Sequence, residues 1–306
     1  MGTFIVRRVG QGALTILILA VLVFVLSRLT GDPLNNLVPL EASPAQRATI
    51  AAQLGLDKPL HEQFIIYFAN LLTGDLGMSF THRVPVSTLF GERIFNSLAL
   101  VIPAFIVVII VGPVLGVVGA TSRFSVVRKA VLIFATLGIA LPVFWLGLVF
   151  VRVFAVELGW LPASRMGDWT HYVLPVASLS LLMIAGMMRL VRSSMLDSLG
   201  RDYIKLARIT GASERSVRWK HALRNSLSSA VAFLGVYMSV LVAGTTVIEK
   251  VFAWPGVGLL LYDAVVARNY PLVQGIILIS AVLVVAVNTV FDVLQAYLDP
   301  KIRLGV

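Results

Sequence analysis

Six stretches of this 306-residue chain contain no aspartate, glutamate, lysine or arginine, and each is long enough to cross a lipid bilayer as a helix. A helix rises about 1.5 Å per residue, so about 20 mostly apolar residues cross a hydrocarbon core of about 30 Å. The stretches contain 19 to 26 residues each: Val9–Ser27, Ser97–Ser122, Ala130–Val151, Trp169–Met188, Asn225–Ile248 and Asn269–Phe291. Because the bilayer interior offers no water to the backbone, such segments must pair their own polar groups. The sequence therefore predicts an all-α polytopic membrane protein with six transmembrane helices.

The composition agrees with this class and excludes others. Hydrophobic residues make up 58% of the chain and charged residues 13%, whereas a soluble domain has about 45–50% and about 25%. Cysteine is absent, which excludes a disulfide scaffold, a cysteine-ligated zinc site, an iron–sulfur cluster and a cysteine nucleophile. The first stretch follows Arg7 and Arg8 as a signal peptide would, but no small-residue cleavage site follows it, which favours an uncleaved helix.

The charges are distributed unevenly between the two sides of the predicted membrane. Arg7 and Arg8 precede the first span, which places the amino terminus in the cytoplasm. The cytoplasmic segments then hold 16 basic and 5 acidic residues, whereas the outer segments hold 9 basic and 10 acidic residues. This asymmetry predicts a multi-pass protein of the plasma (inner) membrane with both termini in the cytoplasm.

The long outer segment between the first two spans contains the signals of two short helices. Ser43 is a plausible N-cap with Pro44 at the first helical position, and Gly55 is a stop signal. A second helix is predicted over Pro59–Leu72, ending at Gly74. Its aromatic and apolar residues share one side: Phe64, Tyr67, Phe68 and Leu71. The segment is either a small cap packed on the membrane domain or a docking surface for an extracytoplasmic partner, and the two interpretations are compatible.

The cytoplasmic segment Arg189–Arg224 carries nine basic and three acidic residues and predicts two short helices. In Leu199–Ile209, apolar residues recur at helical spacing beside a separate basic stripe of Arg201, Lys205 and Arg208. Gly211 suits a position with positive φ after the first helix, and Ser213 suits the N-cap of the second. Anchoring by positive charge and attraction to anionic lipid explain the charge but not the break centred on the glycine.

This loop resembles a known family motif. The run Asp202-Tyr-Ile-Lys-Leu-Ala-Arg-Ile-Thr-Gly211-Ala-Ser-Glu, followed by Lys220-His-Ala-Leu-Arg-Asn225, is similar to the EAA loop of ABC-importer permeases of the dipeptide/oligopeptide type. Further segments of the family pattern follow in order: Gly31-Asp-Pro33, Gly74-Asp-Leu-Gly-Met-Ser79, Trp254-Pro-Gly-Val-Gly258, Arg268-Asn-Tyr-Pro271 and Tyr297-Leu-Asp-Pro-Lys-Ile-Arg303. Asn269 and Lys301 depart from the Asp and Arg expected there. The chain resembles the B-type permease subunit, which has a long outer segment after its first span.

The resemblance implies a fold and a division of the chain. The fold is the type I ABC-importer permease (MetI-like) architecture with a small helical extracytoplasmic segment. The implied division is an amino-terminal transmembrane helix over 1–29, the extracytoplasmic segment over 30–95, and a five-helix permease core over 96–306 that includes the EAA/coupling loop 189–224.

The resemblance also implies a function without catalysis. The chain would be a permease subunit of an ATP-driven importer, forming half of the pathway for dipeptides, oligopeptides or related small solutes that a substrate-binding protein delivers. Its partners would be a second homologous permease subunit in a heterodimer, two ATP-binding subunits or domains, and membrane lipid. No phosphate-binding Gly-x-x-x-x-Gly-Lys-Ser/Thr loop occurs, so ATP and Mg would be bound by the partner subunits, and no cofactor is expected in this chain.

Two sets of site residues follow, and neither is catalytic or metal-binding. The residues expected to couple to the ATPase subunit are Leu199, Asp202, Tyr203, Leu206, Ala207, Gly211 and Ala212. The candidates for lining the pathway are polar residues within the spans: Ser178, Ser180, Thr245, Thr246 and Asn288.

Three other functions are disfavoured by the residues. An ion-coupled secondary carrier normally has ionisable groups at mid-membrane, and the spans hold almost none apart from His171 near an end. An intramembrane enzyme needs a buried nucleophile or metal set, yet the four histidines are scattered and no His-Glu-x-x-His occurs. Nucleic-acid binding is disfavoured because the basic residues lie largely on one membrane face without interleaved aromatic residues.

Overall fold

The computed structural model describes residues 2–29, 34, 38, 42–53 and 55–298, and the regular structure in this part of the chain is helical. The outer segment contributes α3 and α4 between α1 and α5. The elements are α1 (Gly2–Leu29), α3 (Pro44–Gln53), α4 (Leu60–Leu72), α5 (Val86–Thr121), α6 (Ser125–Ala140), α7 (Val143–Phe150), the π-helical turn η1 (Val151–Glu157), α8 (Thr170–Leu199), α9 (Asp202–Ile209), α10 (Glu214–Ser216), the π-helical turn η2 (Val217–Ala222), α11 (Leu223–Val251), α12 (Val257–Val266) and α13 (Tyr270–Leu298). The motif Gly31–Pro33 and the C-terminal motif from Asp299 on lie outside the described residues.

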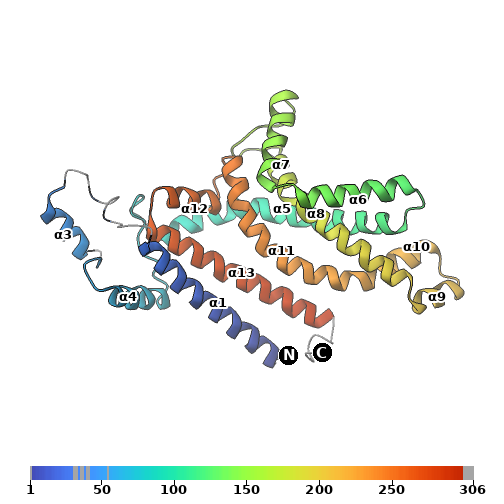
Figure 1. The fold of residues 1–306 in the computed structure, drawn as a ribbon, viewed down its shortest axis with the longest axis horizontal. Coiled ribbons are helices and arrows are strands. Elements are labelled where there is room, and N and C mark those ends of the chain that lie inside the picture. The colour runs from blue at the N-terminus through green and yellow to red at the C-terminus, as the bar shows by residue number, and fades with distance from the viewer. Residues whose placement is uncertain (1, 30–33, 35–37, 39–41, 54, 299–306) are drawn as a thin grey trace.

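The helices form an elongated molecule whose two ends differ (Figure 1). The turn between α5 and α6 lies at one end together with α9 and α10, whereas α3, α4 and α12 lie at the other. Helices α1 and α13 run side by side. Arg8 Nε lies 3.2 Å from Asp292 Oδ2, and Gln274 Nε2 donates a 2.5 Å hydrogen bond to Ser27 Oγ. The first helix is therefore attached to the last one near both of its ends.

Four helices are each long and apolar enough to cross a membrane, and two bent pairs add up to two further spans. The four continuous segments are Ile5–Leu29, Val86–Thr121, Thr170–Leu199 and Tyr270–Ala296. The bent pairs are Ser125–Ala140 with Val143–Glu157, at 106°, and Phe233–Val240 with Gly244–Val251, at 43°. The total of six spans remains a prediction.

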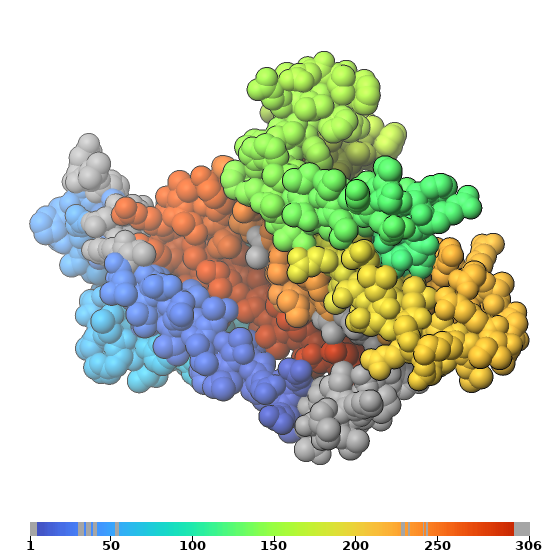
Figure 2. Space-filling model, turned by 45° about the vertical axis from the view of Figure 1, so that its right-hand side comes forward, coloured from blue at the N-terminus to red at the C-terminus, as the bar shows by residue number. Residues whose placement is uncertain are grey.

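The bend between α6 and α7 corrects the expectation of one continuous helix over Ala130–Val151. Helix α6 ends at Ala140, Leu141 is extended with φ −87° and ψ 127°, and α7 begins after Pro142. Proline lacks an N–H group and disfavours a helical conformation in the residue before it, which accounts for the break. Figure 2 shows the segment that follows the bend projecting beyond the rest of the molecule.

The contact between α5 and α8 forms the centre of the core. Buried Leu100, Ala104 and Val108 of α5 belong to one apolar cluster with Met187 and Val191 of α8. Gly112 and Gly116 of α5 let the two backbones approach, because a Cβ atom at either would overlap a side chain of α8. Gly119 faces Val131 of α6 in the same way. At Gly116 an added Cβ would lie 2.7 Å from Val191 Cβ and 3.0 Å from the Met188 carbonyl oxygen. Such small-residue contacts are typical of helix packing in membranes.

The predicted signals of the two outer helices are confirmed. Ser43 Oγ accepts from the Gln46 N–H, and Gln46 Oε1 accepts from the Ser43 N–H, so the first helix begins with a reciprocal cap. Gly55 and Gly74, which follow the two helices, have φ of 64° and 79°. Both predicted stops are therefore left-handed glycines, the conformation that favours this residue.

Helix α4 packs on α1 through the aromatic face that the sequence predicts. The Phe24 ring of α1 lies 5.2 Å from the Phe64 ring and 5.4 Å from the Tyr67 ring, measured between centroids. Burial in this contact raises the pKa of Tyr67 to about 12. Helix α4 thus packs on α1, which is compatible with the interpretation of this segment as a cap.

Asn269 fixes the rest of the outer segment to the turn between α12 and α13. Its Nδ2 group donates to Ser79 Oγ and Thr81 Oγ1, both at 2.8 Å, and its Oδ1 atom accepts from the Phe80 N–H at 3.2 Å. An aspartate would lack the amide donor for the two hydroxyl groups. Asn269, the residue that departs from the family pattern, thus joins residues 79–81 to this turn through three hydrogen bonds.

Replacing Gly116 with alanine should destabilise the protein, because the new methyl group would overlap Val191 and the Met188 carbonyl. Overpacking of this kind costs about 1–3 kcal/mol, which should lower the midpoint of thermal unfolding in detergent micelles. Gly91→Ala is the matched control, since Gly91 lies in the same helix and has no atom within 4 Å of an added Cβ. If the midpoint of thermal unfolding falls no further in G116A than in G91A, the close contact between α5 and α8 is contradicted.

Candidate functional site

The first of two candidate sites is the tip formed by α9 and α10, and its first helix is shorter than predicted. Helix α8 continues to Leu199, Arg201 is extended with ψ 155°, and α9 begins at Asp202. The predicted helix over Leu199–Ile209 is therefore wrong at its first three residues, because Gly200 is a poor helix former and interrupts it. Leu199 packs against the main core and does not lie on the exposed tip.

The predicted end of this helix is confirmed in detail. Gly211 has φ 86°, its N–H donates to the Arg208 carbonyl, and the Ala212 N–H donates to the Ala207 carbonyl at 3.0 Å. This is the Schellman arrangement, which needs a residue in the left-handed region. Ser213 Oγ then accepts from the Ser216 N–H at 3.3 Å and caps α10, as predicted.

Helix α9 has one apolar residue that anchors it and three that remain exposed. Ile204 is completely buried in the same cluster as Val217 of η2. On the other side, Tyr203 is 38% exposed, Leu206 61% and Ile209 83%. Because the anchor is separate from the exposed residues, the helix is held in place while an apolar surface faces outward.

The predicted coupling residues divide between this surface and the core. Tyr203 and Leu206 are exposed apolar residues, while Asp202 and Gly211 are exposed beside them. Ala207 and Ala212 are half-buried, and Ala212 packs against the main core. Ile209 was left out of the prediction although it is the most exposed large apolar residue of α9. Its place in the helical apolar stripe was the sequence signal that could have identified it.

Ion pairs connect α9 to α10 across the glycine turn. Arg208 Nε lies 2.8 Å from Glu214 Oε1, and Arg218 Nε lies 3.8 Å from Glu214 Oε2. Lys205 pairs with Asp202 within α9 at 2.8 Å. The hydrogen bond from Arg208 holds the pKa of the Glu214 carboxyl below its usual value. The basic stripe of the sequence thus includes two residues with acidic partners on the tip.

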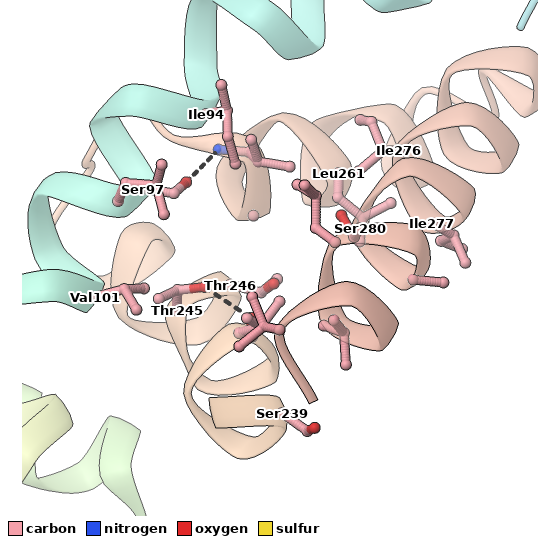
Figure 3. Close-up of a pocket in the computed structure, with 18 of the residues that line it drawn as sticks. Ile94, Ser97, Val101, Ser239, Thr245, Thr246, Leu261, Ile276, Ile277 and Ser280 are labelled. Carbon is pink, nitrogen blue, oxygen red and sulfur yellow. Dashed lines mark hydrogen bonds between the residues drawn. The ribbon is translucent and has the colours of Figure 1, made fainter. Parts of the chain in front are cut away.

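The second candidate site is a cavity of about 610 Å³ between α5, α11, α12 and α13 (Figure 3). Its wall is mainly aliphatic, with five hydroxyl-bearing residues: Ser97, Ser239, Thr245, Thr246 and Ser280. Figure 3 shows Ser97 of α5 and Ser280 of α13 on different walls. Such a cavity offers few hydrogen-bonding groups to a molecule that enters it.

The structure brings some of the predicted pathway residues to this cavity and leaves others in the core. Thr245 and Thr246 are part of its wall, and Asn288 Nδ2 donates a 2.9 Å hydrogen bond to Ser239, which also lines it. Ser178 and Ser180 are buried within α8, where they donate to the Leu174 and Ala177 carbonyls of the same helix. Hydroxyl groups in a span can thus be satisfied by their own helix, which sequence alone does not distinguish from a lining position.

Glu249 forms a hydrogen bond with Ser97 of the cavity wall, and sequence reasoning does not identify it. The fifth uncharged stretch ends at Ile248, so Glu249 was counted as an outer charge, yet it is completely buried in the last turn of α11. Ser97 Oγ donates to Glu249 Oε1 at 2.6 Å, and the Leu259 N–H donates to Glu249 Oε2 at 2.9 Å. The expectation that the spans hold almost no ionisable group apart from His171 is therefore wrong at this position. Its place just before the Trp254–Gly258 motif was the available signal.

Metal binding finds no support in the described part of the chain, where no three histidine, aspartate or glutamate side chains gather closely enough to hold an ion.

Known proteins resemble this chain over nearly its whole length. Residues 112–304 match the family described as "Binding-protein-dependent transport system inner membrane component", and residues 1–101 match that described as "Binding-prot-dependent transport system membrane comp, N-term". The glutathione transport system permease proteins GsiC of Escherichia coli (strain K12) and Salmonella typhimurium (strain LT2) are each 38% identical over 304 residues, which is 99% of both chains. Among solved structures, an inward-facing MetNI methionine ABC transporter matches with TM-score 0.57 and 17% identity, covering 69% of this chain and 96% of that one.

Acid should loosen the tip, because the Arg208–Glu214 pair depends on an ionised carboxyl. Since the pKa of Glu214 is lowered on folding, its stabilising contribution is present above the ordinary carboxyl pKa of about 4.3 and is lost as pH falls through the lowered pKa. We expect hydrogen-exchange protection of the Gly211 and Ala212 amides, corrected for intrinsic rates, to be constant from pH 7 to pH 5 and to fall a few-fold near pH 3. In Glu214→Gln this fall should be absent, and an unchanged fall would exclude the pair as its cause.

Proposed function

Because the chain belongs to the family of binding-protein-dependent transport system inner membrane components and is a permease subunit of an ABC importer, we propose that it forms one half of the membrane passage for glutathione or a related short peptide. It is an inner-membrane multi-pass protein, and a permease subunit of this family has no ATPase site of its own. The cargo class rests on the relatives, which are named as glutathione permeases over the full length of this chain.

The cavity between α5, α11, α12 and α13 is the part of the passage that this chain contributes. Its aliphatic wall and scattered hydroxyl groups suit a cargo that must pass without being held tightly. Thr245 and Thr246 contribute directly to this wall, and Asn288 contributes through Ser239. A second permease subunit would supply the other half, and an extracytoplasmic binding protein would deliver the cargo.

The observation that carries the coupling role is the exposed apolar surface of Tyr203, Leu206 and Ile209 on an anchored helix. An amphipathic helix of this kind binds into a groove of a partner through its apolar residues. Helix α9 lies between the ends of α8 and the helical run that leads into α11, so a push on it is passed to two long helices. We therefore assign its docking partner as an ATP-binding subunit, which would hold the ATP and Mg.

The topology that fits this role has six spans and both termini in the cytoplasm. Each bent pair then counts as one span, and the basic tip with α9 and α10 lies on the cytoplasmic side. The division into 1–29, 30–95 and 96–306 is compatible with this arrangement, although its second boundary lies inside α5, which begins at Val86. The outer helices α3 and α4 then face the binding protein.

Replacing Ile209 with glutamate should break the contact with the ATP-binding subunit, because it places a charge at the most exposed point of the apolar surface. We expect at least a tenfold loss of co-purified ATP-binding subunit from membranes that hold equal amounts of the permease. Val126→Glu is the matched control, since Val126 is 76% exposed near the turn between α5 and α6 at the same end of the molecule. Equal losses in both variants would remove the specific role of α9.

Energy coupling and cargo are tested together in proteoliposomes that contain the complete complex. Uptake of labelled glutathione should require ATP hydrolysis, because the chain is the permease of an ATP-driven importer. Vanadate or omission of ATP should therefore reduce uptake at least tenfold while an imposed ion gradient persists. Uptake that follows the ion gradient without ATP would instead support a secondary carrier, and ATP-dependent uptake of dipeptides without glutathione would correct the cargo.

A further inference from the structure

Residues 249–259, which connect α11 to α12, are held by hydrogen bonds to one turn of α5. The Trp254 indole N–H donates to the Asn96 carbonyl at 2.8 Å, and Asn96 Nδ2 donates to the Pro255 carbonyl at 2.9 Å. Ser97 Oγ accepts from the Val257 N–H at 2.8 Å (Figure 3). Side chains that follow one another on α5 thus hold the backbone that follows α11. We call residues 249–259 the α11–α12 turn.

Glu249 adds further hydrogen bonds to this connection, and both of its carboxylate oxygens accept one. Oε1 accepts from the Ser97 hydroxyl, and Oε2 accepts from the Leu259 N–H in the first turn of α12. Ser97 therefore donates to Glu249 and accepts from Val257, so that α5, α11 and α12 meet at one hydroxyl group and one carboxylate.

Steric fit makes the arrangement rigid. A Cβ atom at Gly256 would lie within 2.4 Å of three atoms of the Glu249 carboxyl group, and one at Gly258 would lie 2.3 Å from Thr246 Cα. The beginning of α12 is therefore pressed against Glu249 on one side and against Thr246, a residue of the cavity wall, on the other. Ser97, which donates to the carboxylate, and Gly258 of α12 also line the cavity.

Burying the carboxyl group of Glu249 costs free energy of desolvation, which argues for a role beyond packing. Among the described residues, no lysine, arginine or histidine forms an ion pair with it, and the adjacent Lys250 pairs with Asp263 at 4.0 Å. Apolar residues often replace buried ionic groups without loss of stability. Donors from Ser97 and the amino terminus of α12 satisfy the carboxylate, and the helix dipole favours a negative charge there.

We infer that Glu249 is a positioning residue for transport: it locks the start of α12 to α5 and so fixes the cavity wall beside Thr246. This inference rests on the proposed function of the cavity as part of the passage. The outer half of α5, the end of α11 and the start of α12 then move as one unit, and the passage opens between this unit and other surfaces. Loss of the lock leaves the fold assembled but the wall loose.

The lock can be probed by thiol chemistry because the chain has no cysteine of its own. In a Thr246→Cys variant, the introduced cysteine is the single thiol of this chain. Its reaction rate with a thiol reagent measures how accessible the cavity wall beside α12 is. Glu249→Ala should raise the rate of its reaction with N-ethylmaleimide at least fivefold in the purified complex. Glu249→Gln should change it less than twofold, because the amide oxygen still accepts from the Leu259 N–H and the amide nitrogen donates to Ser97 Oγ.

Asp263→Asn is the matched control, since Asp263 is a carboxylate of α12 whose contact with Lys250 is long and exposed. In the same Thr246→Cys background, it should leave the reaction rate of the introduced thiol unchanged within experimental error. A change as large as that in Glu249→Ala would mean that any lost carboxylate near α12 opens the wall, and it would overturn the assignment to Glu249.

Transport by complexes with the native Thr246 gives the second measurement. Per inserted complex, Glu249→Ala should lower the maximal rate of glutathione uptake at least fivefold with KM within twofold, and Glu249→Gln should restore most of that rate. If Glu249→Ala lowers only the amount of inserted protein, or leaves both thiol reactivity and rate per complex within twofold, the inference is overturned. Absence of ATP-driven uptake in the unmodified complex would reject the proposed function instead, and the thiol reactivity would still test the lock.

Discussion

The rest of the structure depends on the close contact of α5 with α8. Lipid is as apolar as the side chains, so helices in a membrane gain association energy mainly from close packing, and the glycines of α5 provide it. Both helices then extend beyond this contact. Helix α8 leads into the tip through α9, while the other end of α5 holds the α11–α12 turn through Asn96 and Ser97. One packed pair therefore connects the apolar surface of the tip to the cavity.

Two glutamates illustrate how position decides what a carboxylate does. Glu214 is exposed on the tip, where water competes with Arg208, so its ion pair adjusts a turn that the Gly211 geometry already determines. Glu249 is buried without a cationic partner among the described residues. Its two oxygens accept hydrogen bonds from Ser97 of α5 and from the Leu259 N–H at the start of α12. Removing the first leaves a solvated turn, whereas removing the second leaves buried donors unpaired, which is the more costly case.

Sequence reasoning succeeds where the controlling interaction is local. The long apolar stretches, the N-cap at Ser43 and the left-handed glycines at Gly55, Gly74 and Gly211 depend on neighbouring residues, and the structure contains them. The break at Pro142 is local as well, yet the sequence pattern predicts one continuous helix where the structure bends by 106°. The burial of Glu249 and of Ser178 depends on which helix lies opposite. A single sequence does not contain that information.

The hydrogen bonds that hold the start of α12 against α5 have a physical use beside the cavity. Apolar contacts are nearly independent of direction, so the aliphatic wall alone would allow α12 to slide or rotate along α5 at little cost. Hydrogen bonds weaken steeply with misalignment, so Ser97 and Glu249 allow one register. The Glu249 carboxylate is not part of the cavity wall and Ser97 adds one hydroxyl group to it, so the surface that faces the cavity stays weakly polar. The same chain can thus combine a fixed helix register with a weakly polar cavity wall.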